Sequence, residues 1–439
     1  MRDPGKGGSR RRPRVFGIPR PGCLKAALVA SRRPASARPW ILAPVLALGA
    51  FPFLSIGHAP ANHAPAKNGD VPPPAAPARN PPRDPLFRYQ WHLRAMQIPE
   101  AWSASRGAGA TVAVLDTGVA YENAGRYRRA PDLAGTDFVP GWDFVDGDAH
   151  PNDDLLPGRQ AHGTHLAGVI SQTTDNGLGA AGVAPKAKIM PIRVLGRDGN
   201  GSVETVARGL RFAADHGADV ANLSFAGPTG SKALADAVAY ATSKGVTIVA
   251  SAGNDGSPSV SFPAAYSQVI AVGAVGLDQQ RAYYSSYGKG LDLVAPGGDS
   301  TADRDGDGSV DAVLQQSMRD DPSTFCYCSM ASTSAAAAHV AGAAALLVGS
   351  GRATRPDEVR SALLASARDL GPAASDPEYG AGLVQASSAL AAADSGRPGF
   401  AWIGLALAAV LVLLGLVGLT RRRKRQASRA RPAALSLTP

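Results

Sequence analysis

The feature that most constrains the fold is an alternation of short apolar runs and amphipathic stretches over residues 84–394. The apolar runs are typical of strands that are buried on both faces. They are residues 111–119, 188–195, 218–225, 245–253 and 269–275. Between them, residues 203–217 and 231–245 have helical periodicity, and each stretch ends at a glycine. The alternation predicts an α/β domain in which a mostly parallel sheet carries helices on both faces.

Two apolar segments flank this region. Residues 40–57 form an uncharged run behind a basic stretch, which is the pattern of a secretory signal or an N-terminal anchor. Residues 400–420 are uncharged and, at ~1.5 Å per residue, are long enough to cross a bilayer. Five basic residues follow at 421–425, and the positive-inside rule keeps such a run in the cytoplasm. We expect a single-pass cell-membrane protein whose folded domain is extracytoplasmic.

The charge distribution separates the folded domain from the two ends. The formal net charge is +10, yet residues 84–394 contain 23 basic and 33 acidic residues. The excess positive charge therefore lies in the ends, so we expect no nucleic-acid partner. The expected parts are a basic region (1–39), a signal or anchor segment (40–57), a Pro/Ala-rich linker (58–83), the folded domain (84–394), a transmembrane helix (400–420) and a basic cytoplasmic tail (421–439).

Three residues stand where side-chain chemistry is favoured. Asp116 ends the first predicted strand, and ligands of such sheets bind at the carboxyl ends of strands. His162 precedes a glycine and a helix-like stretch. Ser334 begins an alanine-rich helix, whose N-terminus offers unpaired N–H groups and positive potential to a developing oxyanion. Taken singly, Asp116 is more typical of a loop cap, and His162 is more typical of a structural histidine.

Taken together, the surrounding sequences resemble a known family. The blocks "VAVLDTGV", "HGTHLAG" and "STSAAAAHVAG" resemble the three signature blocks of the subtilisin-like serine proteases, the subtilases. The segments "YQWHLRAMQIPEAW" at 89–102 and "YGAGLVQASSAL" at 379–390 resemble the family's opening and closing stretches. The likeness covers about residues 84–392. It implies a three-layer subtilisin-like fold and a serine endopeptidase acting on protein or peptide substrates.

The resemblance also implies roles for individual residues. Asp116, His162 and Ser334 match the catalytic triad, and Asn254 matches the oxyanion donor. Ser334 is selected over its neighbours because the family nucleophile lies five residues before the histidine of "HVAG". The positions that match the substrate-binding segments are Ser224, Phe225, Ala226, Gly227, Ala252 and Gly253.

The chain departs from the family pattern at several positions. Ser332 stands where glycine is usual, which raises the question of the loop's shape, and Ala335 and Ala338 replace a methionine and a proline. Ala226 replaces a glycine beside the primary specificity pocket and is expected to narrow it. By resemblance to a family loop, the peptide bond before Pro263 is expected to be cis.

An acidic loop suggests a calcium site. "DRDGDGSVD" places Asp303, Asp305, Asp307 and Asp311 around two glycines, like the front half of an EF-hand-type loop. The glutamate usual at the twelfth position is missing, since Leu314 is there, and Asp311 is its expected substitute. A solvated Asp/Gly turn is the alternative. We favour structural calcium.

Two further questions stay open at the level of sequence. A disulfide between Cys326 and Cys328 would close a very short loop, so free thiols are favoured. The main functional prediction is an exported, membrane-tethered serine endopeptidase that acts through an acyl-enzyme. The alternatives are a protease dedicated to processing one secreted partner and a catalytically dead, peptide-binding homologue. The complete triad argues against the last.

Overall fold

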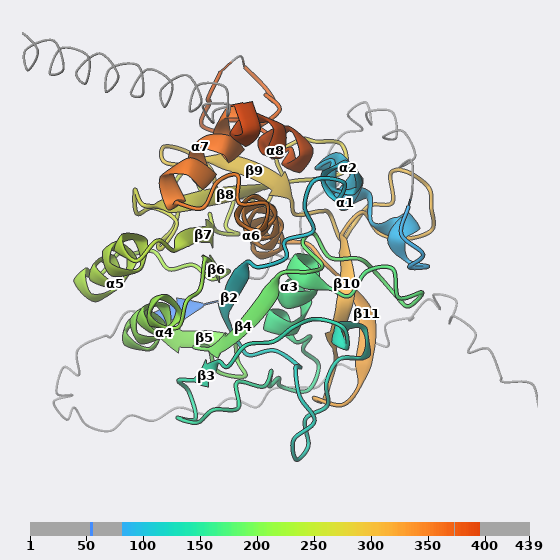
Figure 1. Ribbon diagram of the computed structural model, residues 1–439, viewed down its shortest axis with the longest axis vertical. Helices are drawn as coiled ribbons and strands as arrows, with labels where there is room; N and C mark the ends of the chain where they lie inside the picture. Colours follow the sequence, from blue (N-terminus) through green and yellow to red (C-terminus); the bar gives the residue numbers. More distant parts are fainter. Residues whose placement is uncertain (1–52, 56–80, 373, 396–439) are drawn as a thin grey trace, which may run out of the picture. The chain divides into compact units, whose positions relative to one another are not determined.

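The structure is a computed structural model that describes residues 53–55, 81–372 and 374–395. Its centre is a seven-stranded sheet in which all neighbouring strands are parallel (Figure 1). The strand order is β3 (Trp142–Asp143), β4 (Lys188–Arg193), β2 (Thr111–Asp116), β6 (Val220–Leu223), β7 (Thr247–Ser251), β8 (Val269–Val275) and β9 (Leu293–Pro296). All five predicted strands are present, although most are shorter than expected. The prediction of an α/β fold with a mostly parallel sheet is confirmed.

Helices cover both faces of this sheet (Figure 1). One face carries α3 (His162–Ser171) and α6 (Thr333–Gly349), and the other carries α4 (Val203–Asp215) and α5 (Lys232–Ser243). Successive residues of β2 serve the two cores in turn, because side chains alternate along a strand. Val112 and Val114 pack on the α3 and α6 side, and Ala113 and Leu115 on the α4 and α5 side. This double burial explains the continuous apolar runs in the sequence.

The smaller helical elements extend the core on the α3 and α6 side, to which all of them contribute buried residues. They are η1 (Phe87–Tyr89), α1 (Trp91–Ala95), α2 (Ile98–Ala101), η2 (Pro131–Leu133), α7 (Pro356–Ala365) and α8 (Ala386–Ser395). The opening and closing stretches therefore meet: α2 packs on α8, and the N–H of Ala386 donates to the carbonyl of Met96 at 2.9 Å.

Strand β2 is the point at which the strand order reverses. After β2 the chain builds β3 and β4 on one side of it, and then β6 to β9 on the other. Ligands of open parallel sheets bind at such a reversal, outside the carboxyl ends of the strands. Asp116, the last residue of β2, lies at that place.

Helix α6 runs through the interior. Its first fifteen residues, 333–347, are all buried, so the helix is apolar on every side, as a central helix must be. Alanine and glycine make this packing possible, since a Cβ on Gly342 would lie 2.6 Å from the Cβ of Val183. The helix begins at Thr333 because the Oγ of Ser332 accepts the N–H of Ala335 at 3.2 Å, the bond of an N-cap.

A two-stranded hairpin precedes α6, and the sequence did not predict it. Strands β10 (Val313–Met318) and β11 (Phe325–Met330) pair in antiparallel fashion. Within β11, Cys326 and Cys328 form a disulfide, so the expectation of free thiols is wrong. Residues two apart in a strand project to the same side. Their Cα atoms are 5.5 Å apart, within the range of about 4.4–6.8 Å that disulfides require.

Most of the two predicted membrane or export segments falls outside the described residues. Of residues 40–57, the structure describes Phe53–Ser55, which form β1 and pair antiparallel with β5 (Asn200–Ser202). The segment 400–420, the tail 421–439 and most of the linker 58–83 are not described. No helix within the described ranges combines the length and the apolar character needed to cross a membrane.

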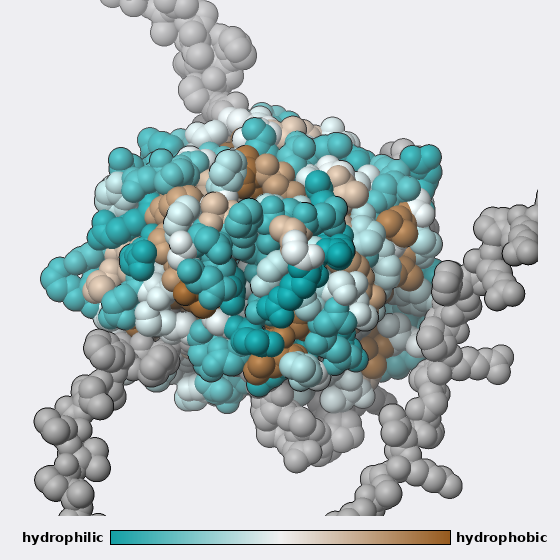
Figure 2. Space-filling view, turned by 90° about the horizontal axis from the view of Figure 1, so that it is seen from below, coloured by the Kyte–Doolittle hydropathy of each residue, from teal (hydrophilic) through white to brown (hydrophobic). Residues whose placement is uncertain are grey.

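The described surface shows no large apolar area on the face seen in Figure 2. Hydrophilic residues dominate that face, and apolar residues form small separate patches (Figure 2). Among the residues that the structure describes, the large apolar side chains classed as exposed are Val145, Leu178 and Val310. The candidate site is therefore the crevice at the end of β2.

Candidate active site

The end of β2 and the start of α3 bring Asp116 and His162 together. The Oδ1 of Asp116 lies 2.8 Å from the Nδ1 of His162, and both side chains are buried. A carboxylate can only accept, so the Nδ1 of His162 carries the proton and donates it. In neutral histidine the Nε2 then holds a lone pair, and this atom has no hydrogen-bond partner. The arrangement is that of an oriented general base.

Ser334 is the second residue of α6 and is buried. Its Oγ donates to the carbonyl oxygen of Ser224 at 3.1 Å. The Oγ of Ser224 donates in return to the carbonyl oxygen of Ser334, also at 3.1 Å. The segment after β6 is thereby joined to the first turn of α6, where unpaired N–H groups and positive potential favour an anion.

Asn254 is fixed beside the same turn. Its Oδ1 accepts two hydrogen bonds from Thr333, from the backbone N–H at 2.9 Å and from the Oγ1 at 2.8 Å. The Oγ1 of Thr333 also lies 3.2 Å from the carbonyl oxygen of Gly253. Because both bonds hold the oxygen of the amide, the orientation of the Asn254 side chain is set by the residue directly before Ser334.

A pocket of about 440 Å³ opens beside His162, and neither Ser334 nor Asn254 is among its lining residues. His162 and Thr117 line one part of it, and Ser332 lines another. The turn at 197–199, directly before β5, forms a further wall. The pocket therefore extends from His162 to the turn that precedes β5.

Comparisons with known proteins identify this arrangement. Residues 107–382 match the family model described as the subtilase family. This chain is a subtilase. It is 38% identical over 283 residues to thermitase of Thermoactinomyces vulgaris, an alignment that covers 64% of this chain and 90% of thermitase. It is 39% identical over 300 residues to subtilisin Savinase of Lederbergia lenta, covering 68% and 97% of the two chains.

A solved structure agrees with these matches. A protease of Pseudoalteromonas arctica superposes with a TM-score of 0.63 at 35% identity, covering 72% of this chain and 100% of that protein. The predicted subtilisin-like fold and the predicted enzyme class are both confirmed. The protein is a serine endopeptidase of the subtilisin type.

The predicted substrate-binding residues lie on two neighbouring segments of the subtilase. Ser224, Phe225, Ala226 and Gly227 follow β6, and Ala252 and Gly253 follow β7. Gly227 pairs with Phe262 through two backbone hydrogen bonds of 2.9 and 3.0 Å. The Phe262–Pro263 peptide bond is cis, as expected. Ala226 is only partly buried.

The serine that replaces the family's glycine has a clear local role. Ser332 has a φ of −169°, an extended conformation that any residue adopts. Its hydroxyl caps α6 as described above, so the added side chain supplies a hydrogen bond to the helix. The sequence signal for this cap was a serine three residues before a run of alanines.

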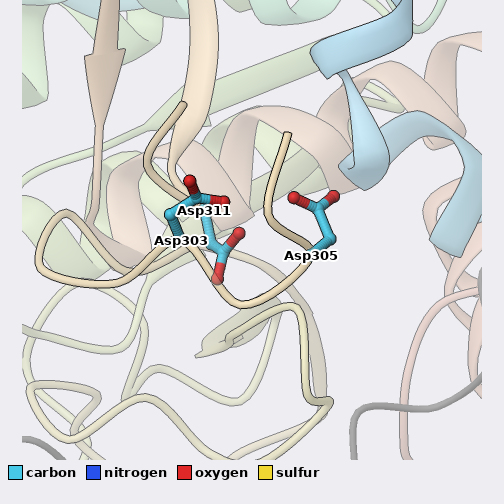
Figure 3. A group of neighbouring side chains, drawn as sticks. All are labelled: Asp303, Asp305 and Asp311. Carbon is cyan, nitrogen blue, oxygen red and sulfur yellow. The ribbon is translucent and has the colours of Figure 1, made fainter. Parts of the chain in front are cut away.

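The acidic loop brings three of its four predicted ligands together. Asp303, Asp305 and Asp311 each offer an oxygen, and these oxygens lie within 4.8 Å of one another. Asp303 and Asp311 lie side by side, and Asp305 lies across the turn from them (Figure 3). Burial, together with the charges of Asp305 and Asp303, raises the pKa of Asp311 to about 6. Carboxylate oxygens in this arrangement suit a hard cation such as calcium.

The fourth predicted ligand, Asp307, is not part of this group. Its Oδ1 accepts the N–H of Ser309 at 2.8 Å, so the local turn uses the carboxylate. The prediction also did not include the positive charge of Arg304 within the loop. The guanidinium of Arg304 lies 3.1 Å from Asp299 and 3.6 Å from Asp311, which partly offsets the acidic charge. The ligand set is therefore smaller than expected, and the loop is less acidic.

The remaining buried histidines of the domain contact neutral partners. The Nε2 of His165 lies 3.1 Å from two backbone carbonyls, those of Val313 and Cys328. His339 and His92 contact each other at 2.8 Å between Nε2 and Nδ1. These contacts give His339 and His92 structural roles. No sequence motif includes both residues, because 247 positions separate them.

Proposed function

We propose that this subtilase is an exported, membrane-tethered endopeptidase that hydrolyses peptide bonds through Asp116, His162 and Ser334 and an acyl-enzyme intermediate. The observation that carries the proposal is the buried 2.8 Å bond between Asp116 and the Nδ1 of His162, which leaves the Nε2 without a partner. This bond fixes the tautomer that a base acting on a serine requires.

Acylation begins when the side chain of Ser334 rotates from the Ser224 carbonyl towards the Nε2 of His162. The Oγ attacks the carbonyl carbon of the substrate, and its proton passes to the Nε2. Asp116 stabilises the resulting imidazolium. The proton then passes to the leaving amine as the peptide bond breaks, and the acyl group stays on the Oγ of Ser334.

Deacylation repeats these steps with water. The Nε2 of His162 takes a proton from water, whose oxygen attacks the ester carbonyl, and the proton returns to the Oγ of Ser334 as the ester bond breaks. In both halves the oxyanion is held by the N–H of Ser334 and the side-chain amide of Asn254. Loss of such a donor lowers the rate by roughly 10²–10³-fold.

Substrate binds as an added strand. The edge of β5 already pairs with an extended segment of the chain itself, Phe53–Ser55. The turn before β5 lines the pocket that also contains His162. Since Phe53–Ser55 occupies this edge, an extended peptide would displace that segment to pair with β5, and would also pair with residues 224–227, through backbone hydrogen bonds that tolerate many side chains. The acid-rich domain surface and the pocket give no indication of a single dedicated substrate.

A fluorophosphonate probe tests the triad directly. Such a probe reacts with an activated serine, so we expect labelling of the parent protein and none of Ser334→Ala. The matched controls Ser329→Ala and Ser332→Ala, which alter the other two serines of the segment, should keep labelling. Labelling that persists in Ser334→Ala and disappears in Ser329→Ala would assign the nucleophile to Ser329 and overturn the proposal.

The tether and the extracytoplasmic location rest on the sequence. The supports are the uncharged segment 400–420, the basic run 421–425 and the apolar segment 40–57. Protease protection of cells stripped of any outer envelope tests this topology. We expect the domain 84–394 to be digested and the tail 421–439 to be protected. Protection of the domain would show that the orientation is wrong.

Structural calcium is proposed at Asp303, Asp305 and Asp311, whose oxygens fit a hard cation. Calcium would offset the mutual repulsion of these carboxylates and order the loop. A ligand specific to the folded state adds about 2.7 kcal/mol at a hundredfold excess over its Kd. Calcium should therefore raise the melting temperature of Ser334→Ala protein, and Asp303→Asn with Asp305→Asn should abolish that shift. Asp307→Asn is the control that keeps it.

A further inference from the structure

The segment that leads into α3 places a second buried carboxylate beside the triad. Asp153 is fully buried and accepts three hydrogen bonds. Its Oδ2 accepts from the N–H and the Oγ1 of Thr164, at 2.7 and 2.6 Å. Its Oδ1 accepts from the Oγ1 of Thr117 at 2.8 Å. Thr117 follows Asp116 directly, and Thr164 lies two residues after His162, so one side chain bonds both triad segments.

The hydroxyl of Thr117 lies between two carboxylates. Its Oγ1 is 2.8 Å from Asp153 and 3.2 Å from the Oδ1 of Asp116. It has a single proton, and the shorter contact is the one with Asp153. The same oxygen accepts the N–H of Gly163 at 3.1 Å. Asp153 therefore directs the hydroxyl proton away from Asp116 and leaves a lone pair for the residue after His162.

This bonding matters for Asp116, because its Oδ1 is already in use. That oxygen accepts the N–H of Thr117 at 2.8 Å and the Nδ1–H of His162 at 2.8 Å. A third donor would compete with His162 for the same lone pairs. Asp153 itself is fully buried and both of its oxygens are bonded to Thr117 and Thr164, so it would act through these two residues.

We propose that Asp153 is a positioning residue for the triad, which holds the end of β2 against the start of α3 and keeps the Thr117 hydroxyl off Asp116. The inference rests on the proposed triad. Burial, with a smaller contribution from the charge of Asp116, raises the pKa of Asp153 to about 6, although the hydrogen bonds from Thr164 and Thr117 lower it. A carboxylate held here at an energetic cost is better explained by positioning than by the capping of α3 alone, which a neutral side chain would achieve.

The exchange Asp153→Asn tests the proposal because it changes a single atom. The new amide group would face the Oγ1 of Thr117, which must then accept from it. The Thr117 hydroxyl would turn to its other acceptor, the Oδ1 of Asp116, and weaken the bond to His162. Misplacement of a catalytic group costs up to about 10²-fold, so we expect kcat to fall about 10- to 100-fold with KM unchanged.

Asp219→Asn is the matched control. Asp219 is a partly buried carboxylate whose pKa burial raises, and its Oδ2 accepts the N–H of Thr111 at 2.8 Å. It therefore holds the opposite end of β2, away from the triad. We expect this variant to keep the parent's kcat. Asp153→Asn with the parent's kcat, or with a loss that unfolding accounts for, would show that Asp153 only caps α3.

If Asp153→Asn does not fold, the pair Thr164→Val and Thr164→Ser tests the positioning role of Asp153. Valine removes the hydroxyl that donates to Asp153 and accepts the N–H of Ala120, and serine restores both bonds. We expect a fall in kcat for valine and recovery for serine. Ser334→Ala distinguishes a failure of the proposed triad from a failure of the proposed role of Asp153. Full activity of Ser334→Ala would overturn the triad, whereas an inactive Ser334→Ala beside fully active Asp153→Asn and Thr164→Val would overturn only the role of Asp153.

Discussion

Two pairs of buried side chains in this domain each contain a histidine hydrogen-bonded at 2.8 Å. His162 contacts Asp116, and His92 contacts His339. His162 begins α3 and His339 lies on α6, the helix that also carries Ser334. In geometry and burial the two pairs are alike. They differ in the group at the end of the hydrogen-bond chain.

The tautomers of the second pair follow from that last group. The Nδ1 of His339 lies 2.8 Å from the carbonyl oxygen of Ala335, which can only accept, so this Nδ1 carries the proton. The Nε2 of neutral His339 then accepts from the Nδ1–H of His92. The Nε2 of His92 holds a bare lone pair, and it has no hydrogen-bond partner, like the Nε2 of His162. In each pair, therefore, the Nε2 of one histidine has no hydrogen-bond partner.

The difference lies in what happens when that atom takes a proton. Protonated His162 faces a carboxylate, which stabilises the cation. Protonated His92 would face only a second imidazole and a peptide carbonyl in a fully buried site. Burial lowers the pKa of His92, and the nearby His339, Arg94 and His165 lower it further. Burial and a fixed orientation alone therefore do not make a histidine a base. The difference between the two pairs is the carboxylate partner.

The largest effect is expected when the carboxylate is removed from the first pair. In Asp116→Asn the amide oxygen would keep the two bonds of the Oδ1, from the N–H of Thr117 and from the Nδ1–H of His162, but the negative charge that stabilises the imidazolium would be lost. We expect kcat to fall about 10⁴-fold with the fold intact. Steady-state kinetics and the melting temperature measure this. An Asp116→Asn enzyme with the parent's kcat would show that the carboxylate partner does not distinguish His162 from His92.

The second pair is expected to matter for stability. His339→Ala leaves a cavity and an unpaired donor on His92, and these should lower the free energy of unfolding by about 2–4 kcal/mol. Denaturant unfolding in a Ser334→Ala background, which prevents self-digestion, measures it. The exposed His216 provides a control, since His216→Ala should change stability by less than about 0.5 kcal/mol. Equal losses in the two variants would show that the buried pair is unimportant.

Acid should weaken the second pair. The pKa of His339 is lowered by burial to about 3, against 6.5 for an ordinary histidine. Above about pH 6.5 the pair is neutral in the folded and unfolded chains alike, and its stabilisation is complete. As the pH falls below this value, the unfolded chain takes up protons that the folded chain does not, so the free energy of unfolding falls towards pH 3.

His92→Asn sharpens this test, because the Nδ2–H of asparagine keeps the bond to His339 while removing one titrating group. We expect a shallower fall of the unfolding free energy between about pH 6.5 and pH 4 than in the parent. Both proteins are measured in the Ser334→Ala background. A parent-like slope in His92→Asn would show that this histidine does not contribute to the acid sensitivity.

The smallest effect concerns the cap of α6, the helix that carries both Ser334 and His339. Ser332→Ala removes the acceptor for the N–H of Ala335 and should cost about 1 kcal/mol, whereas Ser332→Gly should cost only a few tenths. Unfolding in the Ser334→Ala background measures this. A larger loss for glycine than for alanine would mean that backbone freedom, and not the cap, limits this turn.

Sequence and structure agree where local patterns carry the information. The strand ending at Asp116, the start of α3 at His162 and the start of α6 near Ser334 all lie in motifs of a few residues. The bond between His92 and His339 could not be predicted, because only the packing of α1 against α6 creates it. The Cys326–Cys328 disulfide was missed because β11 was not predicted.

The site also contains contacts that no sequence motif predicts. Asp153 is one of two consecutive aspartates in a loop, and nothing in its neighbours distinguishes it from an exposed turn residue. In the acidic loop, the spacing of aspartates correctly suggested a cluster, but not that Asp307 would lie outside it. Side-chain direction in a loop depends on local backbone bonds such as that from Ser309 to Asp307.

Helix α6 also determines how much sequence change this enzyme can accept. A helix with an open side, such as α5, can exchange its outward residues freely. Over residues 333–347 α6 has no outward residue, so each substitution is a change of internal volume. Enlarging a buried alanine costs typically about 1–3 kcal/mol and is relieved by moving the helix. Since Ser334 moves with it, the position of the nucleophile is sensitive to mutations several turns away, and variants selected for altered activity should accumulate on other elements.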